Sequence, residues 1–93
     1  MFVGVLQAEL SIPGAFSLKE KRRVLKGLLE RLRREYGVAA AEVADQDVWN
    51  RARIGVACVS NDARHAASNL QTVVNRLERE RDAVLLDSQI EVM

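Results

Sequence analysis

The strongest constraint on the fold is a hydrophobic periodicity that changes along the chain. Residues 2–12 alternate apolar and polar side chains in their second half, which is typical of a strand with one buried face. From residue 18 onward apolar side chains recur every three to four positions, as on an amphipathic helix, and a similar stretch follows residue 62. The pattern therefore predicts a mixed chain in which strands and helices alternate.

The first helix carries signals at both of its ends. Ser17 and Glu20 have the spacing of a capping box, in which each side chain accepts a hydrogen bond from a free backbone N–H. Gly37 suits a left-handed C-terminal stop, so we expect the helix from about Leu18 to Tyr36. Its apolar stripe, which we expect to lie on a sheet, consists of Leu18, Leu25, Leu28, Leu29, Leu32 and Tyr36.

The rest of the chain divides in the same way. Residues 38–45 are rich in alanine and could continue as helix, but they follow a helix stop, so we predict a strand. A polar connection over 46–52 leads to an apolar strand at 53–60, and Asn61-Asp62 can cap a second helix that ends near Arg81. In the last strand, 83–93, alternation predicts one face with Val84, Leu86, Ile90 and Val92 and another with Leu85, Asp87, Gln89 and Glu91.

This βαββαβ order predicts one α+β domain over residues 1–93. Two right-handed βαβ-type halves place both helices on one face of a four-stranded antiparallel sheet, which is the ferredoxin-like sandwich. Because helices on one side leave the other face wet, the apolar outer faces of the first and third strands need a cover. We expect a homodimer that forms through this open sheet face; the alternative is that small side chains such as Gly55 and Ala57 face water.

Positive charge is concentrated in the first helix. The whole chain has a net charge of only +1, yet residues 19–35 hold eight basic side chains against three acidic ones, a net +5. A solvated helix face is one explanation, but solubilising helices usually interleave the two signs. Lys21 projects towards the apolar side, from where its amine should reach outwards. If the protein binds RNA, the expected phosphate contacts are Lys19, Lys21, Arg22, Arg23, Lys26 and Arg33.

Trp49 lies close to Arg51 and Arg53 in the connection before the third strand. Such a loop can stack a base or anchor a partner, with the arginines on phosphate or carboxylate groups. The alternative, which we favour, is a tryptophan lid over one end of the core with solvated arginines. In the first case Trp49, Arg51 and Arg53 form the predicted partner-binding site.

Enzymatic chemistry has little support in this sequence. His65 and Cys58 are the only soft or borderline metal ligands, so we expect no metal and no cofactor. Cys58 is expected to be a small buried hydrophobe, and Asp62 to cap a helix beside a surface histidine rather than to form an acid–base pair. No apolar run approaches the roughly 20 residues of a membrane span, and the first residues lack a basic signal-peptide start. We expect a non-enzymatic cytoplasmic protein.

Three stretches resemble the YlxP-like bacterial family of uncharacterised small proteins. They are Ser17-Leu18-Lys19-Glu20-Lys21-Arg22, Val43-Ala44-Asp45-Gln46-Asp47-Val48-Trp49-Asn50-Arg51-Ala52 and Ser60-Asn61-Asp62-Ala63-Arg64-His65-Ala66. The resemblance covers the whole chain and implies the ferredoxin-like fold and a cytoplasmic protein. Genes of this family tend to lie among those for translation and ribosome-maturation factors, which implies association with RNA or the ribosome. The alternative function is a homodimeric protein-interaction or regulatory module that uses the Trp49 loop.

Overall fold

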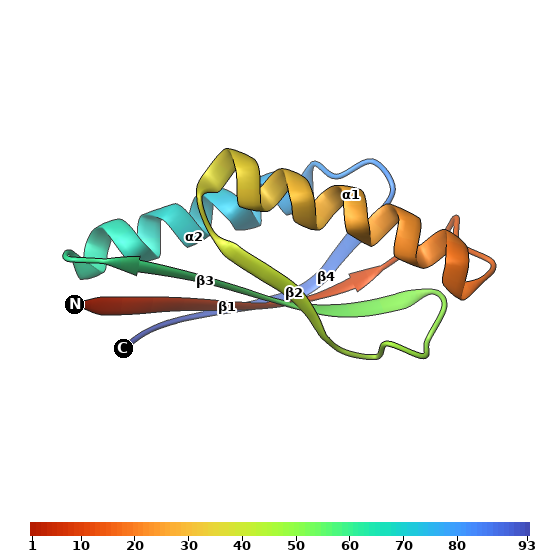
Figure 1. Ribbon diagram of the computed structural model, residues 1–93, viewed down its shortest axis with the longest axis horizontal. Helices are drawn as coiled ribbons and strands as arrows, with labels where there is room; N and C mark the ends of the chain where they lie inside the picture. The colour runs from red at the N-terminus through yellow and green to blue at the C-terminus, as the bar shows by residue number, and fades with distance from the viewer.

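The computed structural model describes residues 1–93 and contains four strands and two helices in the predicted order. The strand order is β2-β3-β1-β4, and every neighbouring pair is antiparallel. Both helices cover one face of the sheet and leave the other face open (Figure 1), which confirms the ferredoxin-like α+β sandwich. The elements are β1 (Phe2–Ser11), α1 (Leu18–Tyr36), β2 (Ala39–Ala44), β3 (Arg51–Ser60), α2 (Ala63–Glu78) and β4 (Val84–Val92).

The ends of α1 follow from local hydrogen bonds. The Ser17 hydroxyl accepts from the Glu20 N–H at 3.1 Å, and the Glu20 carboxylate accepts from the Phe16 N–H at 2.6 Å. At the other end Gly37 has φ +62°, and its N–H donates to the Arg33 carbonyl at 3.2 Å. The left-handed stop and the capping box are thus confirmed, with Glu20 reaching the residue before the cap.

The core lies between the helices and the covered face of the sheet. Its largest fully buried apolar side chains are Leu6, Leu10, Ile12, Leu28, Leu32, Ile54, Leu70 and Leu77. Helix α2 packs closely on β1 at Gly4, where an added Cβ would lie 2.8 Å from Leu70 Cδ1. A glycine at this point therefore lets the helix approach the strand.

The alternation predicted for the last strand is wrong over its first half. Leu85 pairs with Leu10, whereas Asp87 pairs with Glu9, so Leu86 is an extra residue in a bulge. The bulge puts Leu85 against the core and leaves Leu86 exposed, together with Val84. In the preceding hairpin β3 begins at Arg51, two residues earlier than expected, so the loop between β2 and β3 spans only residues 45–50.

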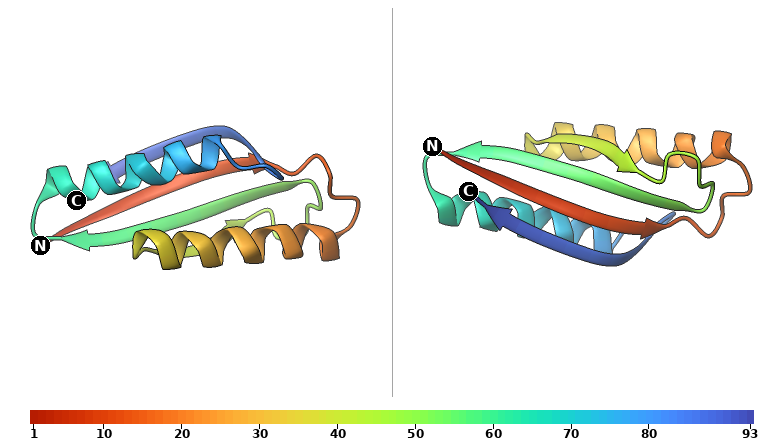
Figure 2. Two further views of the ribbon diagram at one scale, coloured as in Figure 1. Left: turned by 90° about the horizontal axis from the view of Figure 1, so that it is seen from above. Right: turned by 90° about the horizontal axis from the view of Figure 1, so that it is seen from below.

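Neither helix has both the length and the apolar character that crossing a membrane would require. The molecule is elongated, with principal extents of 42 × 20 × 18 Å. The loop between β1 and α1 and the loop between β2 and β3 lie at the same end of the long axis (Figure 2). This end brings residues near 16 and 49 together, far from each other in sequence.

Candidate nucleic-acid interface

A row of exposed cations follows the first half of α1. Lys19, Arg22, Arg23 and Lys26 project away from the apolar stripe because the helix advances about 100° per residue. None of these four side chains forms an ion pair or a hydrogen bond within the protein. We call these four residues the basic face, and they keep their full capacity for an anionic ligand.

Arg33 lies about two turns beyond Lys26 along α1 and forms hydrogen bonds within the fold. Its guanidinium donates two hydrogen bonds to the carbonyl of Ala40, at 3.1 Å from Nε and 2.5 Å from Nη2. Ala40 belongs to β2, an outer strand of the sheet. Arg33 therefore lies beside the basic face with only part of its guanidinium free for phosphate.

Lys21 does not belong to the interface, and its prediction as a phosphate contact is wrong. The side chain is completely buried, and the ammonium donates a hydrogen bond of 2.5 Å to the Asp45 carbonyl. The same nitrogen lies 2.7 Å from Glu42 Oε2, a buried oxygen with no other partner. The amine turns inwards because Glu42 of β2 supplies a carboxylate and Asp45, directly after β2, supplies a carbonyl. Lys21 thus ties the start of α1 to the end of β2.

The loop over residues 45–50 is held at several points. Asp45 adopts φ +63°, and its carbonyl accepts from the Val48 N–H at 3.0 Å as well as from Lys21. Asn50, at the far end of the loop, accepts from the Ile12 N–H at 2.9 Å. The loop is therefore fixed both to α1 and to the end of β1.

Trp49, within this loop, stacks on Phe16 from the loop before α1. The ring centroids are 6.2 Å apart and the ring planes meet at 25°. Trp49 is 43% exposed and Phe16 is 78% exposed, and neither belongs to the core cluster. The favoured lid over the core is therefore wrong. The two rings, which we call the aromatic pair, form an exposed surface next to the start of α1.

Arg51 and Arg53 point to the open face of the sheet. Arg51 Nη1 lies 2.6 Å from one oxygen of Glu9, and Arg53 Nη2 lies 3.7 Å from the other. Glu9 stands between the two arginines on the neighbouring strand β1, in register with Arg53. The structure thus directs both guanidinium groups to a carboxylate of the sheet, whereas Trp49 turns to Phe16.

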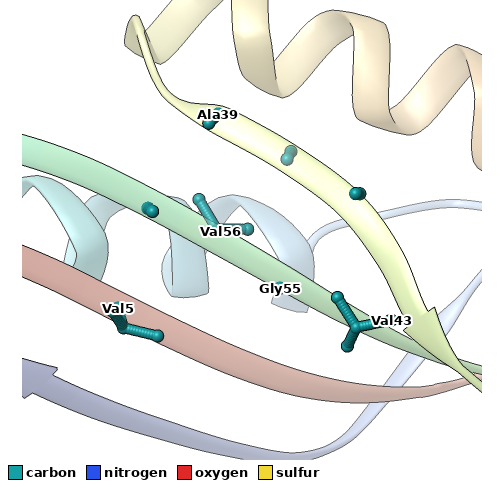
Figure 3. A pocket seen from close by; sticks show the side chains of 8 residues that line it. Val5, Ala39, Val43, Gly55 and Val56 are labelled. Atoms are coloured by element: carbon teal, nitrogen blue, oxygen red, sulfur yellow. The ribbon is translucent and has the colours of Figure 1, made fainter.

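The open face also carries a shallow apolar recess of about 260 Å³ (Figure 3). It spans β2, β3 and β1, and it exists because Gly55 and several alanines leave space beside larger neighbours. Val43 lies over Gly55, where an added Cβ would approach Val43 Cγ1 to 3.0 Å. We call it the open-face recess. In its lining Ala39, Ala41 and Val43 are exposed, and Val5, Gly55 and Ala57 are half-buried.

The remaining titratable candidates have structural roles. Asp62 Oδ1 accepts from the backbone N–H groups of Arg64 and His65 at 2.8 and 3.4 Å, which confirms Asp62 as a helix cap. Cys58 is half-buried rather than buried, and its thiol lies 3.8 Å from the Ala66 carbonyl. Nowhere do three His, Cys, Asp or Glu side chains converge in the way that a metal ion requires.

Sequence reasoning missed two members of this end of the molecule. Phe16 precedes the capping box and has no sequence signal for an exposed aromatic partner. Glu42 faces α1 because it pairs with Ile54, a core residue of β3. Only the strand register, which the sequence does not specify locally, brings Glu42 under Lys21.

Comparison with known proteins supports the family resemblance. The family described as "Protein of unknown function (DUF503)" matches residues 3–90. The protein is also similar to "Uncharacterized protein YlxP" of Bacillus subtilis (strain 168), with 39% identity over 72 residues. That match covers 77% of this chain and 78% of the relative. The chain therefore belongs to the DUF503 family of YlxP-like proteins.

Proposed function

We propose that this protein is a small non-enzymatic cytoplasmic protein that associates with RNA or the ribosome. The basic face of α1 makes the contact, through the phosphates of a structured RNA. One observation carries the proposal: four neighbouring cations are exposed and have no carboxylate partner in the fold. Such cations release condensed counterions when they bind phosphate, which favours association.

Other arginines of the same protein show the contrast. Arg31 and Arg76 both pair with Glu80, at 3.3 and 3.1 Å, and Arg51 pairs with Glu9. These three arginines are thus partly neutralised by a nearby carboxylate. Lys19 and Lys26 keep a local excess of positive charge, which steers polyanions to α1.

The open face of the sheet lacks the side chains that base recognition on a sheet requires. Proteins of this architecture that read RNA on the sheet display aromatic rings on the strands. Here the recess lining is valine, alanine and glycine. Phosphate contacts from a helix fix the position of an RNA without reading its sequence. We therefore propose binding that depends on RNA shape and charge.

The test compares two triple variants of equal charge. The first variant removes three cations of the basic face through Lys19→Ala, Arg22→Ala and Lys26→Ala. Arg64→Ala, Arg79→Ala and Arg81→Ala is the control, because these three are exposed outside α1. Affinity for a labelled RNA hairpin is measured by fluorescence anisotropy between about 50 and 200 mM salt.

We expect the basic-face variant to bind more weakly and to lose about one unit of the log–log salt slope per phosphate contact removed. The control should bind nearly as tightly as the parent, apart from a small effect of net charge. Equal losses in both variants would show that only net charge matters. No loss in the basic-face variant would show that α1 is merely solubilising.

A second candidate, a homodimeric protein-interaction module, is favoured by the open-face recess. Exposed apolar surface on a sheet is a common site of self-association. Ala41→Lys and Val43→Lys place charge on exposed positions that line the recess, and Val84→Lys is a control at an exposed valine outside the recess. If the recess joins two copies, sedimentation velocity should show a dimer that the first two variants abolish and the control preserves.

A further inference from the structure

We infer that the aromatic pair of Phe16 and Trp49 is a stacking platform for an unpaired base. The inference rests on the proposed function and names its substrate class. The preferred ligand is an RNA stem that continues into a single strand. Phosphates of the stem bind the basic face, and a base of the single strand stacks on the pair.

The exposure of both rings is the first support. Phe16 is 78% exposed, so most of its ring is in contact with solvent although the core lies next to it. Trp49 contacts Phe16 and still leaves 43% of its surface exposed. The exposed parts of the two rings form an apolar surface that the fold does not need for its core. Every nucleobase has a π face that can stack on such a surface.

The second support is that the pair is fixed before any ligand binds. The Phe16 N–H donates to Glu20 at 2.6 Å, which holds the backbone at the start of α1. On the other side the loop of Trp49 is fastened by the Asn50 carbonyl to Ile12 and by the Asp45 carbonyl to Lys21. A preorganised surface avoids the entropy cost of ordering a loop on binding.

The third support is the position of the pair relative to the cations. Phe16 precedes Lys19 by three residues, so their Cα atoms are at most about 10 Å apart. Both loops that carry the pair lie at the end of the molecule where α1 begins (Figure 2). A strand that leaves the basic face towards this end can therefore reach the rings.

The experiment uses two RNAs, a blunt hairpin and the same hairpin with a short single-stranded extension. Trp49 is the only tryptophan, so its fluorescence reports directly on the platform. Trp49→Ala and Phe16→Ala remove one ring each, while Trp49→Phe retains a ring. Val48→Ala, an exposed apolar neighbour in the same loop, is the matched control. Circular dichroism melting verifies that each variant is folded.

We expect the parent protein to bind the extended hairpin roughly tenfold more tightly than the blunt one, since stacking on an aromatic ring typically contributes that much per base. The extended hairpin should also quench Trp49 emission. Trp49→Ala and Phe16→Ala should lose this preference and bind the blunt hairpin as the parent does. Trp49→Phe should retain most of the preference, and Val48→Ala all of it.

The outcomes separate this inference from the proposed function. If the parent binds both hairpins equally, or Trp49→Ala keeps the preference, the platform is wrong while phosphate binding by α1 stands. If the parent binds neither hairpin, both proposals are wrong. If Trp49 emission shifts with protein concentration in the absence of RNA, the pair is a contact between copies and the platform is wrong.

Discussion

The ammonium of Lys21 lies 2.7 Å from the Glu42 carboxylate inside the protein, and the lysine side chain has no exposed surface. A buried charge of this kind is stable only when its partners replace the lost water. Glu42 supplies the countercharge and the Asp45 carbonyl supplies a hydrogen bond. The helix that presents cations to solvent is thus fastened to the sheet by a cation that never reaches solvent.

Lys21→Met is expected to destabilise the protein strongly, because Glu42 then keeps its charge without a partner. The free energy of unfolding should fall by about 3 kcal/mol, at the low end for a broken buried pair, since the Glu42 side chain is partly exposed. Urea denaturation measures this loss.

Lys19→Met is the control for this prediction and should change stability by less than about 0.5 kcal/mol, as expected for an exposed position. The double variant Lys21→Met with Glu42→Leu should recover much of the loss, because no unpaired charge remains. A double variant as unstable as Lys21→Met alone would contradict this account of the pair.

Gly4→Ala should test the close approach of α2 to β1. The new methyl group would meet Leu70 Cδ1 at 2.8 Å and Cys58 Sγ at 3.1 Å, so we expect a loss of about 1–3 kcal/mol from overpacking. Leu70→Val in the same chain should relieve part of the loss. Additive losses in thermal denaturation of the single and double variants would show that these two residues do not compete for space.

Asp45 can be tested through its backbone conformation. Its φ of +63° suits glycine and is tolerated by aspartate, but a β-branched side chain is strained there. Asp45→Gly should stay within about 0.5 kcal/mol of the parent, and Asp45→Val should lose about 1–2 kcal/mol. The Asp45 carbonyl also accepts a hydrogen bond from Lys21. If Asp45→Val left the free energy of unfolding unchanged, the loop would not be fixed in this conformation.

The aromatic pair predicts a distinct spectroscopic behaviour. Because Trp49 is partly exposed, its emission in the free protein should lie towards the red, and Phe16→Ala should shift it further. Loss of the pair should cost about 0.5–1.5 kcal/mol, well below the value for a tryptophan buried in a core. Blue-shifted emission of the free parent would mean that Trp49 is buried as a lid over the core, which would contradict the structure.

The parts of the fold that follow from sequence are those with local causes. Ser17 and Gly37 fix the ends of α1 through contacts with residues three or four positions away. The pattern of apolar residues also fixed which face of α1 is buried. Leu85 and Leu86 were assigned to the wrong faces, because a bulge arises from the pairing of two distant strands and leaves no mark in alternation.

In the candidate site, too, the features with local causes follow from the sequence and those that depend on distant residues do not. The exposed cations of α1 follow from helical geometry, and Lys19 and Lys26 lie where the sequence predicts. Lys21 was assigned to the wrong environment because its partners are 21 and 24 residues away in the chain. Phe16 and Trp49 stack only because the β1–α1 loop and the β2–β3 loop lie at the same end of the molecule.

The hydrogen bonds from Arg33 to Ala40 also affect whether copies of this protein aggregate through the edges of their sheets. An outer strand offers unsatisfied amides and carbonyls, which recruit foreign strands and start aggregates. On β2 the Ala40 carbonyl accepts hydrogen bonds from the charged group of Arg33. At the opposite edge, β4 carries Asp87 and Glu91 and no basic residue, so two such edges repel each other. Growth of the sheet beyond four strands is thereby discouraged at both margins.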